Sequence, residues 1–355
     1  MKKHNIVKKF FAVAAAAALT LSLGACTGGQ TQDSQPPQNE TQDVTGATQQ
    51  PAGGKTYKVA IIKQMDHASL DEIAEAVEKR LDEIAAGNGV TIEYETTSGQ
   101  NDQSTLKQLA DQAIADKVDV IIPIATAAAK VAALSAEDTK TPVVFAAVSY
   151  PADEKVQLTG IDHVTGTSDA LNTRFIIDMM LAQNPELKKV GLLYSLSEDN
   201  SAIPIAEAKD YLTEKGIAYS EQTANSNDEV IAAVSALIAD GVDAVFTPTD
   251  NVIQSAELAI YESLIDAGIP HYGGADSFAR NGAFAGSGVN YTLLGGQTAD
   301  LAYDVLTKGM DSMEDYYLLE GGIITVNTET AAAMNIDYSV FSSMGTVVEV
   351  QTTED

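Results

Sequence analysis

Residues 118–148 read VDVIIPIATAAAKVAALSAEDTKTPVVFAAV, and this stretch decides the fold class. Val118–Ile124 is nearly all apolar, which is typical of a strand that is covered on both faces. A helical pattern over Ala127–Leu134 follows, and Pro142–Val148 is another apolar strand. A strand, a helix and a strand in this order indicate a parallel β-α-β unit with a right-handed crossover.

The same alternation continues on both sides of this stretch. It is interrupted around residues 150–167, where Pro, Gly and polar residues gather. The sequence therefore predicts an α/β protein with two doubly wound parallel-sheet lobes joined by a hinge. The other predicted strands are Lys58–Ile62, Val90–Thr96, Lys189–Tyr194, Ile217–Gln222, Ala244–Thr247 and Ile269–Tyr272. The other predicted helices are Leu70–Ile84, Thr105–Ala115, Leu171–Leu181, Ala206–Glu214, Asp228–Ala239 and Ser255–Ala267.

The first 26 residues have the pattern of a secretory signal peptide. Four lysines precede an apolar run over Phe10–Leu23, and small residues then lead to Cys26, the only cysteine. Leu23-Gly24-Ala25-Cys26 resembles the lipobox of bacterial lipoproteins, which implies a lipid on Cys26 once residues 1–25 are removed. An ordinary signal peptide with a chance cysteine is the alternative. We expect a protein anchored by lipid to the extracytoplasmic face of the cell membrane, with 26–56 as a disordered polar tether.

Length and charge narrow the function classes further. The chain has 355 residues, enough for two domains beyond the tether. Its 50 acidic residues outnumber 21 basic ones, for a net charge of −29. Without residues 1–25, which hold four lysines and no acid, the charge is −33 (21 − 4 − 50). Such a surface repels phosphate backbones and anionic lipid headgroups, so no nucleic-acid partner is expected.

Six stretches together resemble tryptophan-type ABC transporter substrate-binding proteins, a branch of the bilobed type I periplasmic binding proteins. The resemblance covers the chain from about residue 57 onward. This chain has Tyr150 where that family commonly carries an acid. The stretches are Val59–Asp71 (VAIIKQMDHASLD), Ile122–Lys130 (IPIATAAAK), Pro142–Pro151 (PVVFAAVSYP), Gly191–Ser201 (GLLYSLSEDNS), Phe246–Asn251 (FTPTDN) and Tyr291–Leu306 (YTLLGGQTADLAYDVL).

The resemblance implies a protein that closes on a small solute, an amino acid and by family resemblance an aromatic one, and delivers it to an ABC permease with a separate ATPase. Service to a sensor or another surface partner is the alternative. Three chain crossings between the lobes are implied, near Thr165, Tyr291 and Leu319. Residues 57–164 with 292–319 then form lobe 1, and 165–291 with 320–355 form lobe 2.

Ligands of open α/β sheets bind beyond the carboxyl ends of the strands, so the candidate contacts are the residues that follow each strand. They are mostly uncharged and polar, which suits a small zwitterion. The predicted ligand-binding residues are Gln64, His67, Thr126, Ala127, Ser149, Tyr150, Asn200, Ser201, Asp250, Asn251 and Asp276.

Several of these residues have two interpretations. Thr126 and Ser201 lie near helix starts, where free N–H groups favour a carboxylate, but both also suit plain N-caps. Asp250 can pair with a ligand ammonium or cap the following helix. On the ammonium interpretation, Asp250→Ala weakens binding with little loss of fold.

The roles of the remaining polar candidates also stay open. Asn200 can donate to and accept from the ligand, whereas Glu198 is as easily a solvated first-turn acid. His67 can cap the helix at Leu70, bond the ligand or lie at the rim. Tyr150 can stack on a flat ligand or be an exposed loop tyrosine.

Motifs for catalysis and for cofactors are missing from the sequence. The histidines after the signal peptide, His67, His163 and His271, lie far apart and form no zinc-ligand spacing. There is no G-x-S-x-G elbow and no Walker A motif, and Gly286-Ser287-Gly288 and Gly295-Gly296 are not nucleotide fingerprints. We expect turns and close packing near a crossover at these glycines, and no enzymatic activity, cofactor or metal.

Overall fold

A computed structural model describes residues 54–353, which belong to one compact unit containing two sheets. The predicted signal peptide and Cys26, and the predicted tether up to residue 53, lie outside the described residues. The first sheet has the strand order β11-β5-β4-β3-β1-β2, and all its strand pairs are parallel. Its strands are β1 Thr56–Lys63, β2 Thr91–Ser98, β3 Val120–Ile124, β4 Val143–Phe145, β5 Val164–Ser168 and β11 Tyr317–Leu318.

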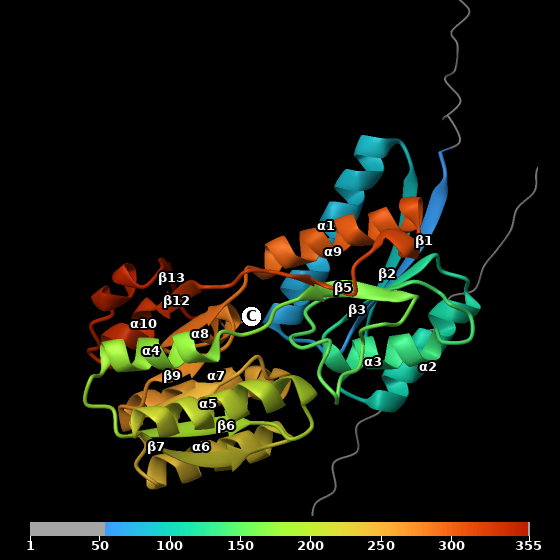
Figure 1. Cartoon of the computed structure of the whole chain (residues 1–355). Coiled ribbons are helices and arrows are strands. Elements are labelled where there is room, and N and C mark those ends of the chain that lie inside the picture. The colour runs from blue at the N-terminus through green and yellow to red at the C-terminus, as the bar shows by residue number, and fades with distance from the viewer. Residues whose placement is uncertain (1–53, 354–355) are drawn as a thin grey trace, which may run out of the picture. The chain divides into compact units, whose positions relative to one another are not determined.

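Helices cover both faces of the first sheet, whose central strands β3 and β4 are buried and apolar on both sides. In β3, Ile122 packs with the helices α1 and α9, whereas its neighbour Ile121 packs with α2 and α3. Figure 1 shows α1 and α9 side by side, although more than 200 residues separate them in the sequence. The helices are α1 Ala68–Asn88, α2 Gln103–Ala115, α3 Thr126–Ser135 and α9 Tyr291–Lys308.

The second sheet has the order β13-β12-β10-β9-β8-β6-β7, and only its β10–β12 pair is antiparallel. Its strands are β6 Lys189–Tyr194, β7 Ala218–Thr223, β8 Ala244–Thr247, β9 His271–Gly273, β10 Ala285–Gly288, β12 Ile323–Asn327 and β13 Thr346–Val350. The helices of this lobe are α4 Thr173–Gln183, α5 Ala202–Lys215, α6 Asn227–Ala239, α7 Asn251–Ala267, α8 Asp276–Arg280 and α10 Thr328–Ala333.

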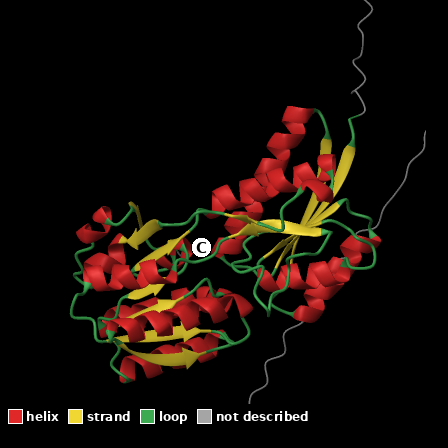
Figure 2. Ribbon diagram, viewed as in Figure 1, coloured by secondary structure: helices red, strands yellow, loops and turns green. Residues whose placement is uncertain are grey.

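Two apolar layers also enclose the second sheet, so that both lobes are three-layered (Figure 2). Phe246 of β8 packs with α4 and α5, and its neighbour Val245 packs with α6 and α7. Fold class and parallel topology agree with the sequence-based prediction. Among the described residues, no helix has the length and apolar character needed to cross a membrane.

The chain passes between the two sheets three times, through 169–172, 289–290 and 319–322. The sequence placed the first passage near Thr165, but Thr165 lies inside β5 and pairs with Val144 of β4. Residues 165–168 therefore belong to the first sheet. The Thr-Gly-Thr composition of β5 concealed this strand, since its burial comes from tertiary packing and not from apolar side chains.

Gly295 lets α9 lie directly against α1. A Cβ atom at residue 295 would be 2.6 Å from the carbonyl oxygen of Ile73 and 2.7 Å from the Cβ atom of Ala76. Such contacts require the two helices to separate. Gly296, the next residue of α9, has open space around its Cα.

We expect Gly295→Ala to lower the free energy of unfolding by about 1–3 kcal/mol, because it overpacks a close helix contact. Gly296→Ala is the matched control, and should be neutral or stabilising by up to about 1 kcal/mol since alanine favours a helix. Urea unfolding of both variants measures the difference. Equal stabilities of the two variants would contradict the close-packing role of Gly295.

Candidate functional site

A cavity lies between the carboxyl ends of the two sheets. It holds about 360 Å³ free of protein atoms, including open solvent at its mouth. Polar residues that follow the strands line it from both lobes: His67, Thr126, Ser149 and Asp169 from the first, and Asn200, Thr249, Asp250 and Asn251 from the second. Leu70, Phe278 and Tyr291 contribute the large apolar surfaces of the wall.

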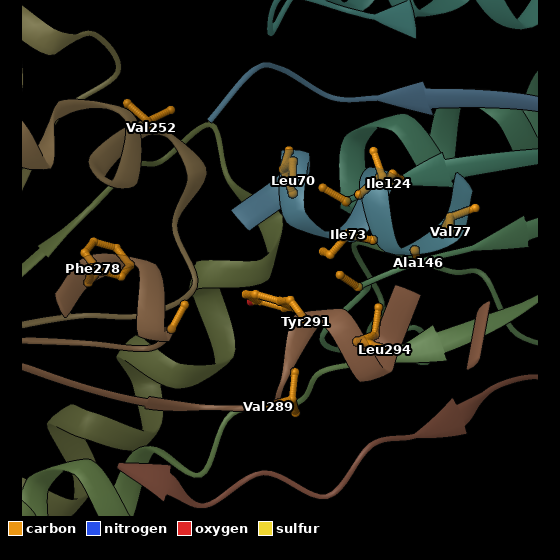
Figure 3. Close-up of a cluster of buried hydrophobic side chains, with 14 of the residues drawn as sticks. Leu70, Ile73, Val77, Ile124, Ala146, Val252, Phe278, Val289, Tyr291 and Leu294 are labelled. Carbon is orange, nitrogen blue, oxygen red and sulfur yellow. The ribbon is translucent and has the colours of Figure 1, made fainter. Parts of the chain in front are cut away.

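The apolar wall brings together helices from both lobes. Figure 3 shows Leu70 of α1, Phe278 of α8 and Tyr291 of α9 within one buried cluster. Two of the three are aromatic rings, which can pack against a flat apolar group. No lysine or arginine of the described residues lines this cavity.

Asp169 is a buried carboxyl group in the first passage between the lobes. Its Oδ1 atom accepts a hydrogen bond from Ser149 Oγ at 2.8 Å, and its Oδ2 atom accepts one from Tyr291 Oη at 3.1 Å. Burial raises the pKa of Asp169, and the two hydrogen bonds only partly oppose that shift. A carboxylate has about four acceptor positions, so Asp169 retains room for a cationic donor in the cavity.

Asp250 has no such room, which changes the interpretation of this residue. Its Oδ1 atom accepts from the backbone N–H groups of Val252 and Ile253, both at 3.1 Å. Its Oδ2 atom accepts from Ser195 N and Ser201 Oγ, both at 2.7 Å. The fully buried Asp250 carboxylate is therefore the N-cap of α7 and ties that helix to the loops after β6.

Thr126 and Ser201, the two predicted helix-start residues, differ in position. Thr126 begins α3 and lines the cavity, and the N-cap residue Ala125 offers no side-chain acceptor to the first helical N–H groups. The next amide, Ala127 N, donates to Gln64 Oε1 at 3.1 Å. Ser201 donates to Asp250 and does not line the cavity, so of these two helix starts that of α3 is the one available to a ligand anion.

Side chains of the two lobes bond directly to one another around the cavity. Gln64 Nε2 donates to Glu198 Oε1 at 2.7 Å, and His67 Nε2 lies 3.0 Å from Asn251 Oδ1. Ser69 and Ser277 share a hydroxyl hydrogen bond, and Lys130 forms an ion pair with Asp199. These contacts hold the lobes in a closed arrangement.

Three polar atoms at the cavity are buried and have no hydrogen-bond partner among the described residues. They are His67 Nδ1, Asn200 Oδ1 and Gln254 Nε2. Asn200 Nδ2 donates to Thr249 O, and Gln254 Oε1 accepts from Ser277 Oγ, so the other end of each amide is occupied. Buried polar groups are normally paired, so these three atoms are available to a polar ligand or to water.

Five of the predicted site residues do not line the cavity. Gln64 Oε1 accepts from Ala127 N, and Ser201 Oγ donates to Asp250. The Tyr150 hydroxyl donates to Leu171 O at 3.4 Å, so the residue contacts the passage between lobes. Asp276 pairs with Arg280 one turn along α8. The predictions for Tyr150 as a stacking group and Asp276 as a contact do not fit these positions.

The cavity also contains residues that the sequence analysis did not select. Asp169 was missed because β5 was not expected, although an acid directly after that strand follows the same rule as the other candidates. Gln254, Phe278 and Tyr291 lie within helices, where polar or aromatic residues give no local signal. Glu198 is buried and not a solvated first-turn acid. No cluster of His, Cys, Asp and Glu suited to a metal ion occurs among residues 54–353.

Comparison with known proteins agrees with this architecture. The family model described as ABC transporter substrate binding protein matches residues 58–340, and the chain belongs to this family. A curated relative is the tyrosine-binding protein of Clostridioides difficile (strain R20291). It is 28% identical over 304 residues, covering 84% of this chain and 87% of the relative. The family description and the name of this relative both describe binding of a substrate or an amino acid.

Two solved structures that resemble this chain differ in ligand state. A Streptococcus pneumonia ABC domain in complex with L-Trp has a TM-score of 0.75 and 26% identity, covering 83% of this chain and all of that one. The ligand-free, open structure of a Clostridium difficile substrate-binding protein has a TM-score of 0.62 and 25% identity, covering 84% of this chain and all of that one. The protein thus has the type I periplasmic-binding-protein fold, and it resembles the L-Trp complex more than the open structure.

Proposed function

We propose that this protein captures an aromatic L-amino acid between its lobes and delivers it to an ABC permease with a separate ATPase. The observation that carries the proposal is Asp169, a buried carboxyl group with spare acceptor positions in a cavity whose described lining has no basic side chain apart from His67. An ammonium group is the cation that suits it, since each of its N–H bonds can be directed at an acceptor. Asn200 Oδ1 offers a second acceptor, unpaired among the described residues.

The other parts of an amino acid have complementary groups as well. The N-terminus of α3 and Gln254 Nε2, which has no partner in the described part of the chain, offer N–H donors for the carboxylate. Phe278 and Tyr291 offer aromatic surface for a flat side chain. The names of two relatives, a tyrosine-binding protein and a domain bound to L-Trp, support the choice of aromatic amino acids.

A thermal-shift screen tests the ligand class. The chain from Thr27 on retains every residue of the compact unit and lacks Cys26. A ligand that binds only the folded state raises its melting temperature by mass action. We expect a selective rise with L-tyrosine, L-tryptophan or L-phenylalanine among amino acids, nucleosides, sugars and small peptides. A rise with a sugar or nucleoside alone would contradict the proposal, once a copurified ligand has been removed by unfolding and refolding.

The proposed location is the extracytoplasmic face of the membrane, with lipid on Cys26 as the anchor. The sequence of residues 1–26 supports this location. The acidic composition argues against attraction of the protein to anionic lipid headgroups, so the attachment is assigned to the lipid. Detergent-phase partitioning of the full chain and of Cys26→Ser tests the anchor. We expect the full chain in the detergent phase and Cys26→Ser in the aqueous phase after secretion. Identical partitioning of both would contradict the anchor.

A further inference from the structure

Gln64 has only one possible orientation in the closed protein. Its Oε1 atom accepts from the backbone N–H of Ala127, and a backbone N–H can only donate. Gln64 Nε2 therefore faces Asn101 Oδ1 at 3.1 Å and Glu198 Oε1 at 2.7 Å. As a consequence, Glu198 Oε1 always faces the N–H donor of Gln64 and must accept its hydrogen bond.

The second oxygen of Glu198 leads to the cavity through two more side chains. Asn251 Nδ2 donates to Glu198 Oε2 at 2.6 Å, and Asn251 Oδ1 lies 3.0 Å from His67 Nε2. In this arrangement His67 carries its proton on Nε2, and Nδ1 is a bare acceptor. Nδ1 is buried, lacks a partner among the described residues and belongs to a side chain that lines the cavity.

A proton on Glu198 Oε2 reverses the direction of the two hydrogen bonds that join Glu198 to Asn251 and Asn251 to His67. The new O–H group donates to Asn251 Oδ1, which requires the amide to turn over. Asn251 Nδ2 then donates to His67 Nε2, so the neutral ring carries its one proton on Nδ1 instead. Both arrangements satisfy all the hydrogen bonds between Glu198 and His67, and they differ only in what His67 presents to the cavity.

We propose that Glu198 is a positioning residue that decides, through Asn251, which ring nitrogen of His67 carries the proton. His67 is thereby a specificity-determining residue of the ligand site. With Glu198 ionised, the cavity offers an acceptor at Nδ1 and selects a ligand with an N–H or O–H group there. With Glu198 protonated, it offers a donor.

The surroundings of these residues favour a protonated Glu198 and a neutral His67. Burial, and next the Asp250 carboxyl, raise the pKa of Glu198 to about 8, against hydrogen bonds from Asn251 and Gln64. Lys130 is engaged by Asp199, the neighbour of Glu198. Burial lowers the pKa of His67 to about 4, although Asn251, Asp71 and Asp66 favour its charged form and Lys63 opposes it. His67 is therefore neutral at pH 6 and above, and only its tautomer changes.

Nitrogen NMR on a locked closed protein tests the inference without a ligand. Ser69 Oγ and Ser277 Oγ are in contact across the lobes, so Ser69→Cys with Ser277→Cys can form a disulfide in the chain from Thr27 on. With ¹⁵N-labelled histidine, we expect the His67 proton on Nδ1 at pH 6 and on Nε2 at pH 9.5. His67→Gln assigns the signals, because His163 and His271 remain.

Glu198→Gln makes the sharper test. Since Gln64 Nε2 still needs an acceptor, the carbonyl of the introduced glutamine faces Gln64 and its amide donates to Asn251, so the His67 proton stays on Nδ1 at both pH values. Glu257→Gln is the matched control: Glu257 is a buried carboxyl group of the same lobe that bonds His271 and does not line the cavity. Glu257→Gln should leave intact the change of the His67 tautomer between pH 6 and 9.5. An unchanged His67 tautomer between pH 6 and 9.5 in the locked protein overturns the inference.

The consequence for selectivity rests on the proposed function. At pH 8.5, where most of the ligand keeps its ammonium proton, we expect Glu198→Gln, without the disulfide, to bind L-tyrosine more weakly than the wild type by about tenfold or more, because the cavity of the variant presents a donor in place of an acceptor. If the tautomer follows Glu198 but no aromatic amino acid binds, the proposed function is wrong and the positioning role stands. If L-tyrosine binds but the tautomer does not follow Glu198, the positioning role is wrong.

Discussion

Asp169→Asn is expected to weaken binding of the aromatic amino acid by about 30-fold or more, with little loss of fold. The asparagine side chain has the same shape and can still accept from Ser149 or Tyr291, so the contacts within the passage between lobes largely remain. What is lost is the negative charge opposite a buried ammonium group. Removing one partner of a buried, hydrogen-bonded charge pair costs about 2–5 kcal/mol, and about 1.4 kcal/mol is tenfold in affinity. Isothermal titration calorimetry with L-tyrosine, L-tryptophan and L-phenylalanine measures the effect.

Asp276→Asn is the matched control for this prediction. Asp276 is also an acid at the inner end of a lobe, but it pairs with Arg280 and lies outside the cavity lining. The Asp276→Asn substitution removes the same charge from the protein as Asp169→Asn does, so a long-range effect of net charge would appear in both variants. We expect its affinity to stay within about twofold of the wild type. Equal losses in the two variants would contradict the ammonium-binding role of Asp169.

Asp250→Ala is expected to lower the free energy of unfolding by about 2–4 kcal/mol, a large loss for a single substitution. The carboxylate satisfies three backbone N–H groups and one hydroxyl in a fully buried position. Alanine leaves these donors unpaired, and each unpaired buried group costs about 1–3 kcal/mol before relaxation. This result differs from the expectation from sequence, in which the same substitution weakened binding and spared the fold.

Asp102→Ala provides the comparison for Asp250→Ala. Asp102 is the N-cap of α2, and it accepts from Thr105 N at 2.7 Å on the exposed surface. Loss of an exposed N-cap costs about 1 kcal/mol, because water replaces the carboxylate. Urea unfolding of both variants therefore separates the buried anchor from an ordinary cap. A loss for Asp250→Ala no greater than for Asp102→Ala would contradict the anchoring role.

The strongly periodic parts of the fold could be predicted from the sequence. Lys189–Tyr194 and Ala244–Thr247 were predicted with the bounds that the structure gives, since each is a compact run between clear helix ends. β5 could not be found, because Val164–Ser168 has one large apolar residue and is buried only by its neighbours. Strand β10 was missed because its sequence, AGSG, has no large apolar residue and is also buried by its neighbours.

The site was predictable in position more than in detail. The rule that ligands bind beyond the carboxyl ends of strands selected His67, Thr126, Ser149, Asn200 and Asn251, and the structure brings all five to the cavity. Sequence could not show that Asp250 is already saturated with hydrogen bonds, or that Glu198 is buried, because both facts depend on loops from distant segments meeting. Asp169 remained hidden together with the strand that precedes it.

The most direct test of the account compares L-tyrosine with 3-(4-hydroxyphenyl)propionate, the same molecule without its amino group, by isothermal titration calorimetry. If Asp169 holds the ammonium group of an aromatic amino acid, L-tyrosine binds and the analogue binds at least about 30-fold more weakly. If the two ligands bind equally, or if none of the three aromatic amino acids binds to protein freed of copurified ligand, the central claim is contradicted.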